Sequence, residues 1–318
     1  MNSCSVVSRR CLAALPFALA LPARGQARGA RIVTTTAMLA DAVRALAGDG
    51  LSVTALIGEG VDPHLYRPTR ADTQRLLAAD LVILNGHRLE GRMEEVLARL
   101  ARAGRRVLAL AEQLPREKLR RHPEIPDAAD PHIWMDPLLW AEAAGHLLPA
   151  LAPWLAVGRG EEGLAAYRAR LQRIHAYAEG ALGAIPAERR VLVTAHDAFG
   201  YFGQRYGLAL ESIQGISTES EASLARIEQL VALLVERRIP AVFAEASVPD
   251  RAVQALIEGA AARGHRVQLG GTLFSDSLGR AGTYTGTVEG MLDHNITTIA
   301  RALGGTAPAG GLNGRLAA

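Results

Sequence analysis

The chain has 318 residues, of which 35 are Lys or Arg and 32 are Asp or Glu. Its hydrophobic content of 49% excludes a disordered chain and is enough for the cores of two domains or one large one. An aromatic content of 4% and the lack of a basic stripe argue against nucleic-acid binding.

Residues 1–27 have the pattern of an export signal. They hold Arg9, Arg10 and Arg24 and no acidic residue, which leaves 32 basic against 32 acidic residues in the rest of the chain. The apolar stretch Cys11–Leu21 is shorter than the roughly 20 residues of a membrane anchor, the alternative interpretation. The pair Arg9-Arg10 also resembles a twin-arginine signal, so the export route stays open.

Both cysteines of the chain, Cys4 and Cys11, lie inside this leader. Neither stands at the end of the apolar stretch, where a lipid-modified cysteine is expected. The sequence therefore predicts a soluble periplasmic protein with a cleaved signal peptide, without a lipid anchor, disulfide or cysteine metal site.

Beyond residue 30, short apolar runs alternate with helical patterns, which indicates an α/β fold with small, mainly parallel sheets. Helices are expected over Ala222–Arg237, after a capping-box pattern of Thr218 and Glu221, and over Thr285–Leu303. The predicted strands are Arg31–Thr36, Val53–Ile57, Leu81–Asn85, Arg106–Leu110, Arg190–His196, Ala241–Ser247 and Arg266–Gly270.

The segment Glu161–Ala184 interrupts this alternation. Its apolar residues recur at spacings of three and four, which predicts one helix of roughly 36 Å. We expect two α/β lobes joined by this helix; the alternative is an ordinary helix within a single large sheet. The expected division is a signal peptide at 1–27, an N-terminal lobe at 28–157, a connecting helix at 158–187, a C-terminal lobe at 188–304 and a flexible tail at 305–318.

Three of the nine histidines stand apart by their context. His64 and His132 each follow Asp-Pro, at Asp62-Pro63 and Asp130-Pro131, and proline makes such a loop stiff. His196 ends a predicted strand, where open α/β sheets bind ligands.

Asp276 follows the last predicted strand and is a fourth candidate. Three imidazoles and a carboxylate form a donor set that suits Zn²⁺ and that Mn²⁺ or Fe²⁺ could also occupy. From the residues alone, structural histidines at strand ends remain the alternative.

Several longer motifs resemble the metal-specific solute-binding proteins of ABC importers, the zinc/manganese (TroA/ZnuA-like) family, and the branch with three histidines and one aspartate in particular. The resemblance spans about residues 30–304. The motifs are Asp62-Pro63-His64-Leu65-Tyr66, Asp130-Pro131-His132-Ile133-Trp134, Val193–Phe202, Gln214–Thr218 and Gly270–Asp276.

The resemblance implies a metal in the cleft between two lobes, with His64 and His132 from the first lobe and His196 and Asp276 from the second. It places Glu245 near the site, where a hydrogen-bonding role is expected. It also implies a monomer that is not an enzyme, captures Zn²⁺ or Mn²⁺, and delivers it to a membrane permease with its cytoplasmic ATPase.

The metal itself stays open among Zn²⁺, Mn²⁺ and Fe²⁺. The histidine at position 196 favours Zn²⁺, whereas Glu112–Asp130 contains only His122 and so lacks the His-rich loop of many zinc-specific members.

Two alternative functions remain. One is a secreted metallohydrolase with Asp276 or Glu245 as base, although the chain has no His-Glu-x-x-His motif. The other is a metal-dependent adhesin, which the missing lipid-anchor cysteine disfavours.

Overall fold

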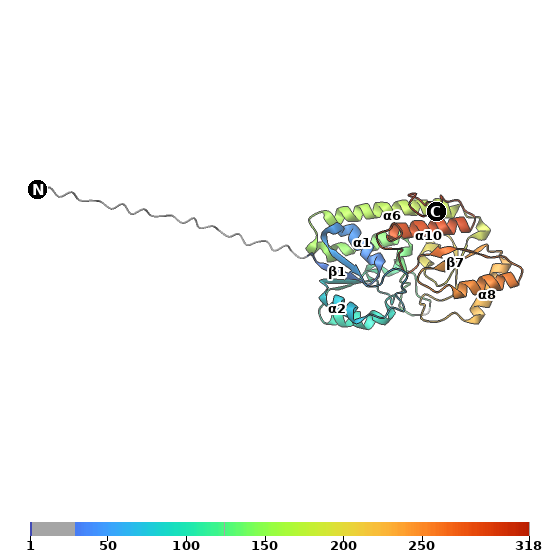
Figure 1. Ribbon diagram of the computed structural model, residues 1–318, viewed down its shortest axis with the longest axis horizontal. Coiled ribbons are helices and arrows are strands. Elements are labelled where there is room, and N and C mark those ends of the chain that lie inside the picture. Colours follow the sequence, from blue (N-terminus) through green and yellow to red (C-terminus); the bar gives the residue numbers. More distant parts are fainter. Residues whose placement is uncertain (2–28, 124, 318) are drawn as a thin grey trace.

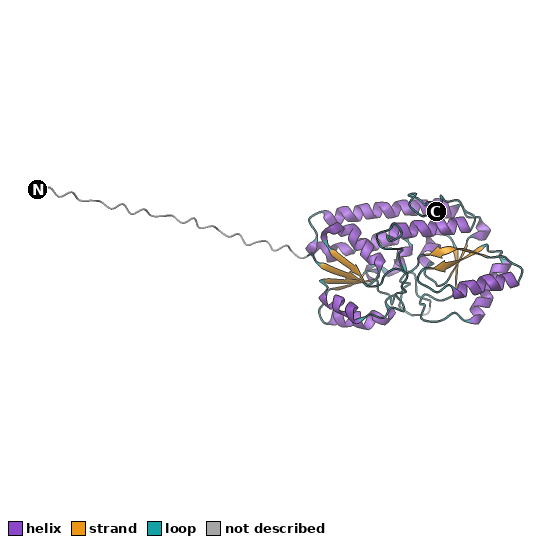
Figure 2. Ribbon diagram, in the orientation of Figure 1, coloured by secondary structure: helices purple, strands orange, loops and turns teal. Residues whose placement is uncertain are grey.

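Two α/β lobes stand side by side, and the long helix α6 (Arg159–Gly183) runs along both (Figures 1 and 2). The computed structural model describes residues 29–123 and 125–317, together with Met1. The predicted signal peptide therefore lies outside the described residues. Separate small sheets and one long helix confirm the predicted fold class, and they exclude the alternative of a single large sheet.

The first lobe contains a four-stranded parallel sheet in the order β2-β1-β3-β4. Successive side chains of its central strands enter different cores: Ile32 and Ile83 face the core beneath α6, while Val33 and Val82 face the core beneath α2 and α3. Because both faces are buried there, apolar residues stand next to each other in these strands instead of alternating with polar ones. The elements are β1 (Arg31–Thr34), α1 (Ala37–Ala47), β2 (Ser52–Ala55), α2 (Arg70–Ala78), β3 (Leu81–Leu84), α3 (Glu94–Arg102), β4 (Val107–Ala109), α4 (Pro137–Gly145) and α5 (Leu147–Leu151).

The second lobe contains two parallel strand pairs, β5-β6 and β7-β8, with β5 lying beside β7. Here too the strands separate two cores, since Val191 and Val193 pack with α8 and α9, and Leu192 packs with α6 and α10. The elements are β5 (Val191–Thr194), α7 (Gly200–Tyr206), β6 (Ala209–Ser212), α8 (Leu224–Glu236), β7 (Ala241–Glu245), α9 (Arg251–Ala262), β8 (Gln268–Leu273) and α10 (Val288–Ala302).

All seven predicted strands are present, but three local features differ from the prediction. The strand β6 was not predicted, because a four-residue run that includes Glu211 carries little apolar signal. Strand β8 continues to Leu273 through two glycines that resemble a strand end. Helix α8 begins only at Leu224, where Ser223 accepts a hydrogen bond from the Arg226 backbone, so the predicted cap at Thr218 and Glu221 is wrong.

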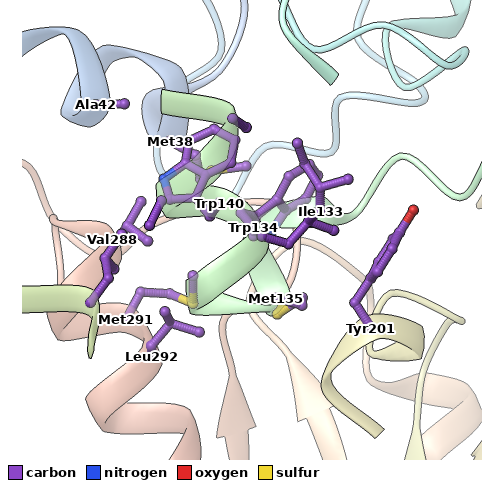
Figure 3. Close-up of a cluster of buried hydrophobic side chains, with 14 of the residues drawn as sticks. Met38, Ala42, Ile133, Trp134, Met135, Trp140, Tyr201, Val288, Met291 and Leu292 are labelled. Atoms are coloured by element: carbon purple, nitrogen blue, oxygen red, sulfur yellow. The ribbon is translucent and has the colours of Figure 1, made fainter. Parts of the chain in front are cut away.

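Helix α6 joins the lobes through a shared core. The apolar residues whose spacing predicted it are all buried, and α1, α4 and α10 pack against α6. These residues are Leu164, Tyr167, Leu171, Ile174 and Ala178. Figure 3 shows the middle of this core, where Trp134 and Trp140 lie close to Met38 of α1 and Met291 of α10. The core thus continues from one lobe into the other.

One buried hydrogen-bond network ties four helices together within this core. The Tyr167 hydroxyl of α6 accepts from the Trp140 indole of α4 at 2.8 Å and donates to the Asp41 carboxylate of α1 at 3.1 Å. The same carboxylate oxygen accepts from the backbone N–H of Val288 at the start of α10, also at 3.1 Å. The network fixes where α10 begins relative to the first lobe.

The segment 305–317 packs against α10. The Leu312 backbone donates to the Asp293 carboxylate at 2.8 Å, and the Asn313 amide donates to the Tyr284 hydroxyl at 2.7 Å. The Gly and Ala content of this segment predicts a flexible tail instead. Composition alone does not show that the buried Asp293 carboxylate accepts a hydrogen bond from this segment.

None of the helices in the described part of the chain has the length and apolar character needed to cross a membrane.

Replacing Tyr167 with phenylalanine tests the network. We expect Tyr167→Phe to lower the free energy of unfolding of the metal-free protein by about 2 kcal/mol, since it leaves the buried Trp140 N–H without an acceptor. Denaturant titration gives the value. Tyr177→Phe is the matched control on the same helix, because Tyr177 is half-buried and its hydroxyl bonds the Thr297 hydroxyl, so its loss should matter less. Equal losses in the two variants would contradict the role of the network.

Candidate metal centre

Four chain segments meet where the lobes face each other. His64 lies in the loop between β2 and α2. His132 precedes α4, and the short turn Ile133–Met135 lies between them. His196 follows β5 by two residues, and Asp276 follows β8 by three. Each lobe therefore supplies two of the predicted ligands, at loops that follow strands or precede a helix.

The structure brings all four predicted residues together. One potential ligand atom from each lies within 4.8 Å of the others, and all four side chains are buried. The Asp276 carboxylate is central: its oxygens lie 3.5 Å from His64 Nε2, 3.3 Å from His132 Nε2 and 3.0 Å from His196 Nε2. The centroids of the three imidazole rings are 5.4 to 6.0 Å apart.

The facing atoms lack protein partners. Within the described residues, the Nε2 atoms of the three histidines and both Asp276 oxygens are buried and have no hydrogen-bond partner. Buried polar atoms are nearly always satisfied, because an unsatisfied one costs free energy. Three nitrogens and a carboxylate that converge in this way fit a tetrahedral Zn²⁺ site and can also hold Mn²⁺ or Fe²⁺.

Carboxylates hold two of the rings in the required orientation. Asp130 Oδ1 contacts His132 Nδ1 at 2.8 Å and also accepts from the His132 backbone N–H at 3.0 Å. Glu245, at the end of β7, contacts His196 Nδ1 at 2.5 Å and accepts from the His196 backbone at 2.8 Å. With Nδ1 engaged in this way, Nε2 of the neutral ring would present its lone pair to the centre once its proton has left, as in known carboxylate–histidine–metal arrangements.

Asn295 and Trp134 hold the loops of the converging residues through hydrogen bonds to the backbone. Asn295 of α10 exchanges two hydrogen bonds with the backbone of Phe274, at 2.9 and 2.7 Å, and so fixes the loop of Asp276. The Trp134 indole donates to the Ser275 carbonyl at 2.8 Å, which joins the loops of His132 and Asp276. Only Trp134 lies within a motif that the sequence singled out.

Two histidines outside the centre bond backbone carbonyls. His265 Nε2 contacts the Ile239 carbonyl at 2.8 Å, and His294 Nε2 contacts the Thr272 carbonyl at 2.9 Å. His146 is exposed at the end of α4. These side chains are not among the four residues that converge.

Burial and charge shift the pKa values of the four converging residues in different directions. Burial lowers the pKa of His64 to about 3. Burial also disfavours the charged form of His132, but the carboxylates of Asp276 and Asp130 outweigh it and raise the pKa of His132 to about 9. Glu245 and Asp276 likewise hold the pKa of His196 well above its usual value despite burial. Burial alone would raise the pKa of Asp276, yet His196 and His132 hold it well below its usual range.

A family model, a relative in sequence and a solved structure all match this chain over most of its length. Residues 32–302 match the model of the family described as zinc-uptake complex component A, periplasmic (ZnuA). The zinc-binding protein TroA of Treponema pallidum is 44% identical over 275 residues, covering 86% of this chain and 88% of TroA. The solved structure of TroA superposes on this chain with a TM-score of 0.83. The superposition covers 86% of this chain and 99% of the TroA chain.

Two lipoproteins are also similar. The manganese-binding lipoprotein MntA of Bacillus subtilis is 40% identical over 280 residues, covering 86% of this chain and 89% of MntA. The metal ABC transporter substrate-binding lipoprotein FimA of Streptococcus parasanguinis is 29% identical over 302 residues, covering 91% of this chain and 96% of FimA.

The pKa values predict how metal binding depends on pH. In the metal-free protein the pKa of His132 is about 9, so at neutral pH a proton must leave before the imidazole can bind a metal. Zn²⁺ affinity should therefore rise steadily from pH 6 to pH 8.5 and fall on acidification, with proton release on binding. Calorimetric titrations in buffers of different ionisation enthalpy measure that release. An affinity that does not change with pH over this range would contradict the assignment.

Proposed function

The chain belongs to the ZnuA family of periplasmic zinc-uptake components, and on that premise we propose that it captures a divalent transition metal and delivers it to an ABC-type importer. The observation that carries this proposal is the buried convergence of three imidazole nitrogens and one carboxylate. The partners would be a membrane permease and its cytoplasmic ATPase, in line with the description of FimA as a substrate-binding lipoprotein of a metal ABC transporter. Names of the three relatives give no support to the hydrolase or adhesin alternatives.

His64, His132, His196 and Asp276 are the proposed ligands. Together they would fill all four positions of a tetrahedral shell, which leaves no position for a water nucleophile, and we therefore propose a binding protein without catalytic activity. Two ligands come from each lobe, so the metal would hold the lobes together. A permease could then distinguish the filled form from the empty one.

Zn²⁺ is the metal that the donor set favours. A site with three nitrogen donors binds Zn²⁺ more tightly than Mn²⁺ or Fe²⁺, while Mn²⁺ prefers oxygen donors. The relatives include both a zinc-binding and a manganese-binding protein. We propose that both metals bind here and that Zn²⁺ binds more tightly.

The same proposal covers the location and the chain division. Arg9-Arg10 and the following apolar stretch support export to the periplasm with cleavage of residues 1–27. We propose that the mature protein is a monomer, with lobes at 28–157 and 188–304 and the connecting segment at 158–187.

Metal titration of the purified, metal-stripped mature protein tests this function. We expect one tightly bound equivalent of Zn²⁺ and weaker binding of Mn²⁺. In His196→Ala the Zn²⁺ affinity should fall by at least about 100-fold, because removing a metal ligand costs more affinity than removing a residue that only hydrogen-bonds to a ligand. His265→Ala is the control, since that imidazole bonds a backbone carbonyl away from the centre. No stoichiometric binding, or equal effects of the two substitutions, would contradict the ligand set.

A further inference from the structure

The two Asp-Pro-His loops hold their histidines through the same backbone contact. Asp62 Oδ1 accepts from the His64 N–H at 2.8 Å, and Asp130 Oδ1 accepts from the His132 N–H at 3.0 Å. In both loops a hydroxyl group from the second lobe then contacts the aspartate. Both hydroxyl groups come from buried residues, Thr218 and Tyr201, but Asp62 is half-buried whereas Asp130 is fully buried.

The His132 loop is fastened in the interior. The Tyr201 hydroxyl of α7 donates to the Asp130 carbonyl at 2.8 Å and accepts from the Arg120 backbone at 3.1 Å, and Tyr201 is buried. Asp130 also contacts the His132 ring, as described above. Several buried contacts therefore hold this ligand to the second lobe.

The His64 loop is fastened at the edge of the cleft. Thr218, in the segment between β6 and α8, donates from Oγ1 to Asp62 Oδ2 at 2.5 Å. The residues that follow, 219–221, are exposed. The neighbouring ion pair between Arg92 and Glu219, at 3.5 Å, is also exposed, and such pairs contribute little.

His64 also has space beside it. A cavity of about 220 Å³ at the junction of the lobes is lined by His64, Gly91 and Arg92 from the first lobe and by Ile216, Ser217 and Glu219 from the second. Gly91 allows the closest approach, since a Cβ there would lie 2.7 Å from the His64 carbonyl oxygen. The His64 backbone thus packs closely against Gly91, while the cavity leaves space beside the same residue.

We propose that Thr218 is a positioning residue that holds His64 in the metal shell from the opposite lobe through Asp62, and that His64 is the ligand that leaves first when the metal is released. This inference rests on the proposed function, because it concerns the same site. The hydroxyl donates to the carboxylate oxygen that does not bind the His64 backbone, so one aspartate connects the second lobe to the ligand. Loss of the hydroxyl frees Asp62, and the His64 loop then relaxes toward the cavity.

The rate of Zn²⁺ release tests the proposal. With the Zn²⁺-loaded protein mixed into excess chelator in a stopped-flow instrument, Thr218→Val should release the metal about tenfold faster, the effect of losing one hydrogen bond to a carboxylate. Thr218→Ser keeps the hydroxyl and should release at close to the wild-type rate. Ser217→Ala is the matched control, since that hydroxyl lines the same cavity but contacts only the Glu219 backbone.

A double variant separates positioning from a general structural effect. In a His64→Ala background, Thr218→Val should add no further acceleration, because the threonine acts through His64. Three results would overturn the proposal: wild-type release from Thr218→Val, no rescue by serine, or an undiminished effect of Thr218→Val without His64. Failure of the wild-type protein to bind one equivalent of Zn²⁺ would instead contradict the proposed function itself.

Discussion

The mutual approach of one carboxylate and three imidazoles in a buried cleft is the constraint on which the rest of the structure depends. Asp276 alone faces all three histidines, and their converging atoms have no protein partners among the described residues. Burying these groups costs free energy, which protons on His132 and His196 offset in the metal-free chain and which a bound cation would offset in their place. The surrounding fold must therefore hold these groups together in the absence of metal, and the carboxylates of Asp130 and Glu245 do so directly.

The frame that resists this cost is built from helices that contact both lobes. Helix α6 extends along both lobes, and α10 begins at a hydrogen bond to Asp41 of the first lobe while Asn295 on the same helix holds the Asp276 loop. The position of a ligand in the second lobe is thus set partly from the first. This shared core disfavours large independent movement of the lobes. The proposed release of the metal through the His64 loop, at the edge of the cleft, needs no such movement.

Much of the fold and of the candidate site could be predicted from the sequence, because the signals were local. Buried parallel strands are continuously apolar, the spacing in α6 is regular, and each Asp-Pro-His loop can be recognised within three residues. The contacts that hold the ligands could not be predicted in this way. Thr218 resembled a helix cap, yet its hydroxyl binds an aspartate 156 positions away, and Asn295 is one polar residue in an amphipathic helix. Such partners are decided by tertiary structure, as is the packing of the segment 305–317.

X-ray absorption spectroscopy of the Zn²⁺-loaded protein tests the central claim most directly, because it counts the atoms around the metal. We expect a first shell of four nitrogen or oxygen atoms at roughly 2.0 to 2.1 Å, with the outer-shell scattering of three imidazole rings. His64→Ala should reduce that scattering to two rings. A shell with sulfur, with fewer than three imidazoles, or with scattering unchanged by the substitution would contradict a metal held by His64, His132, His196 and Asp276.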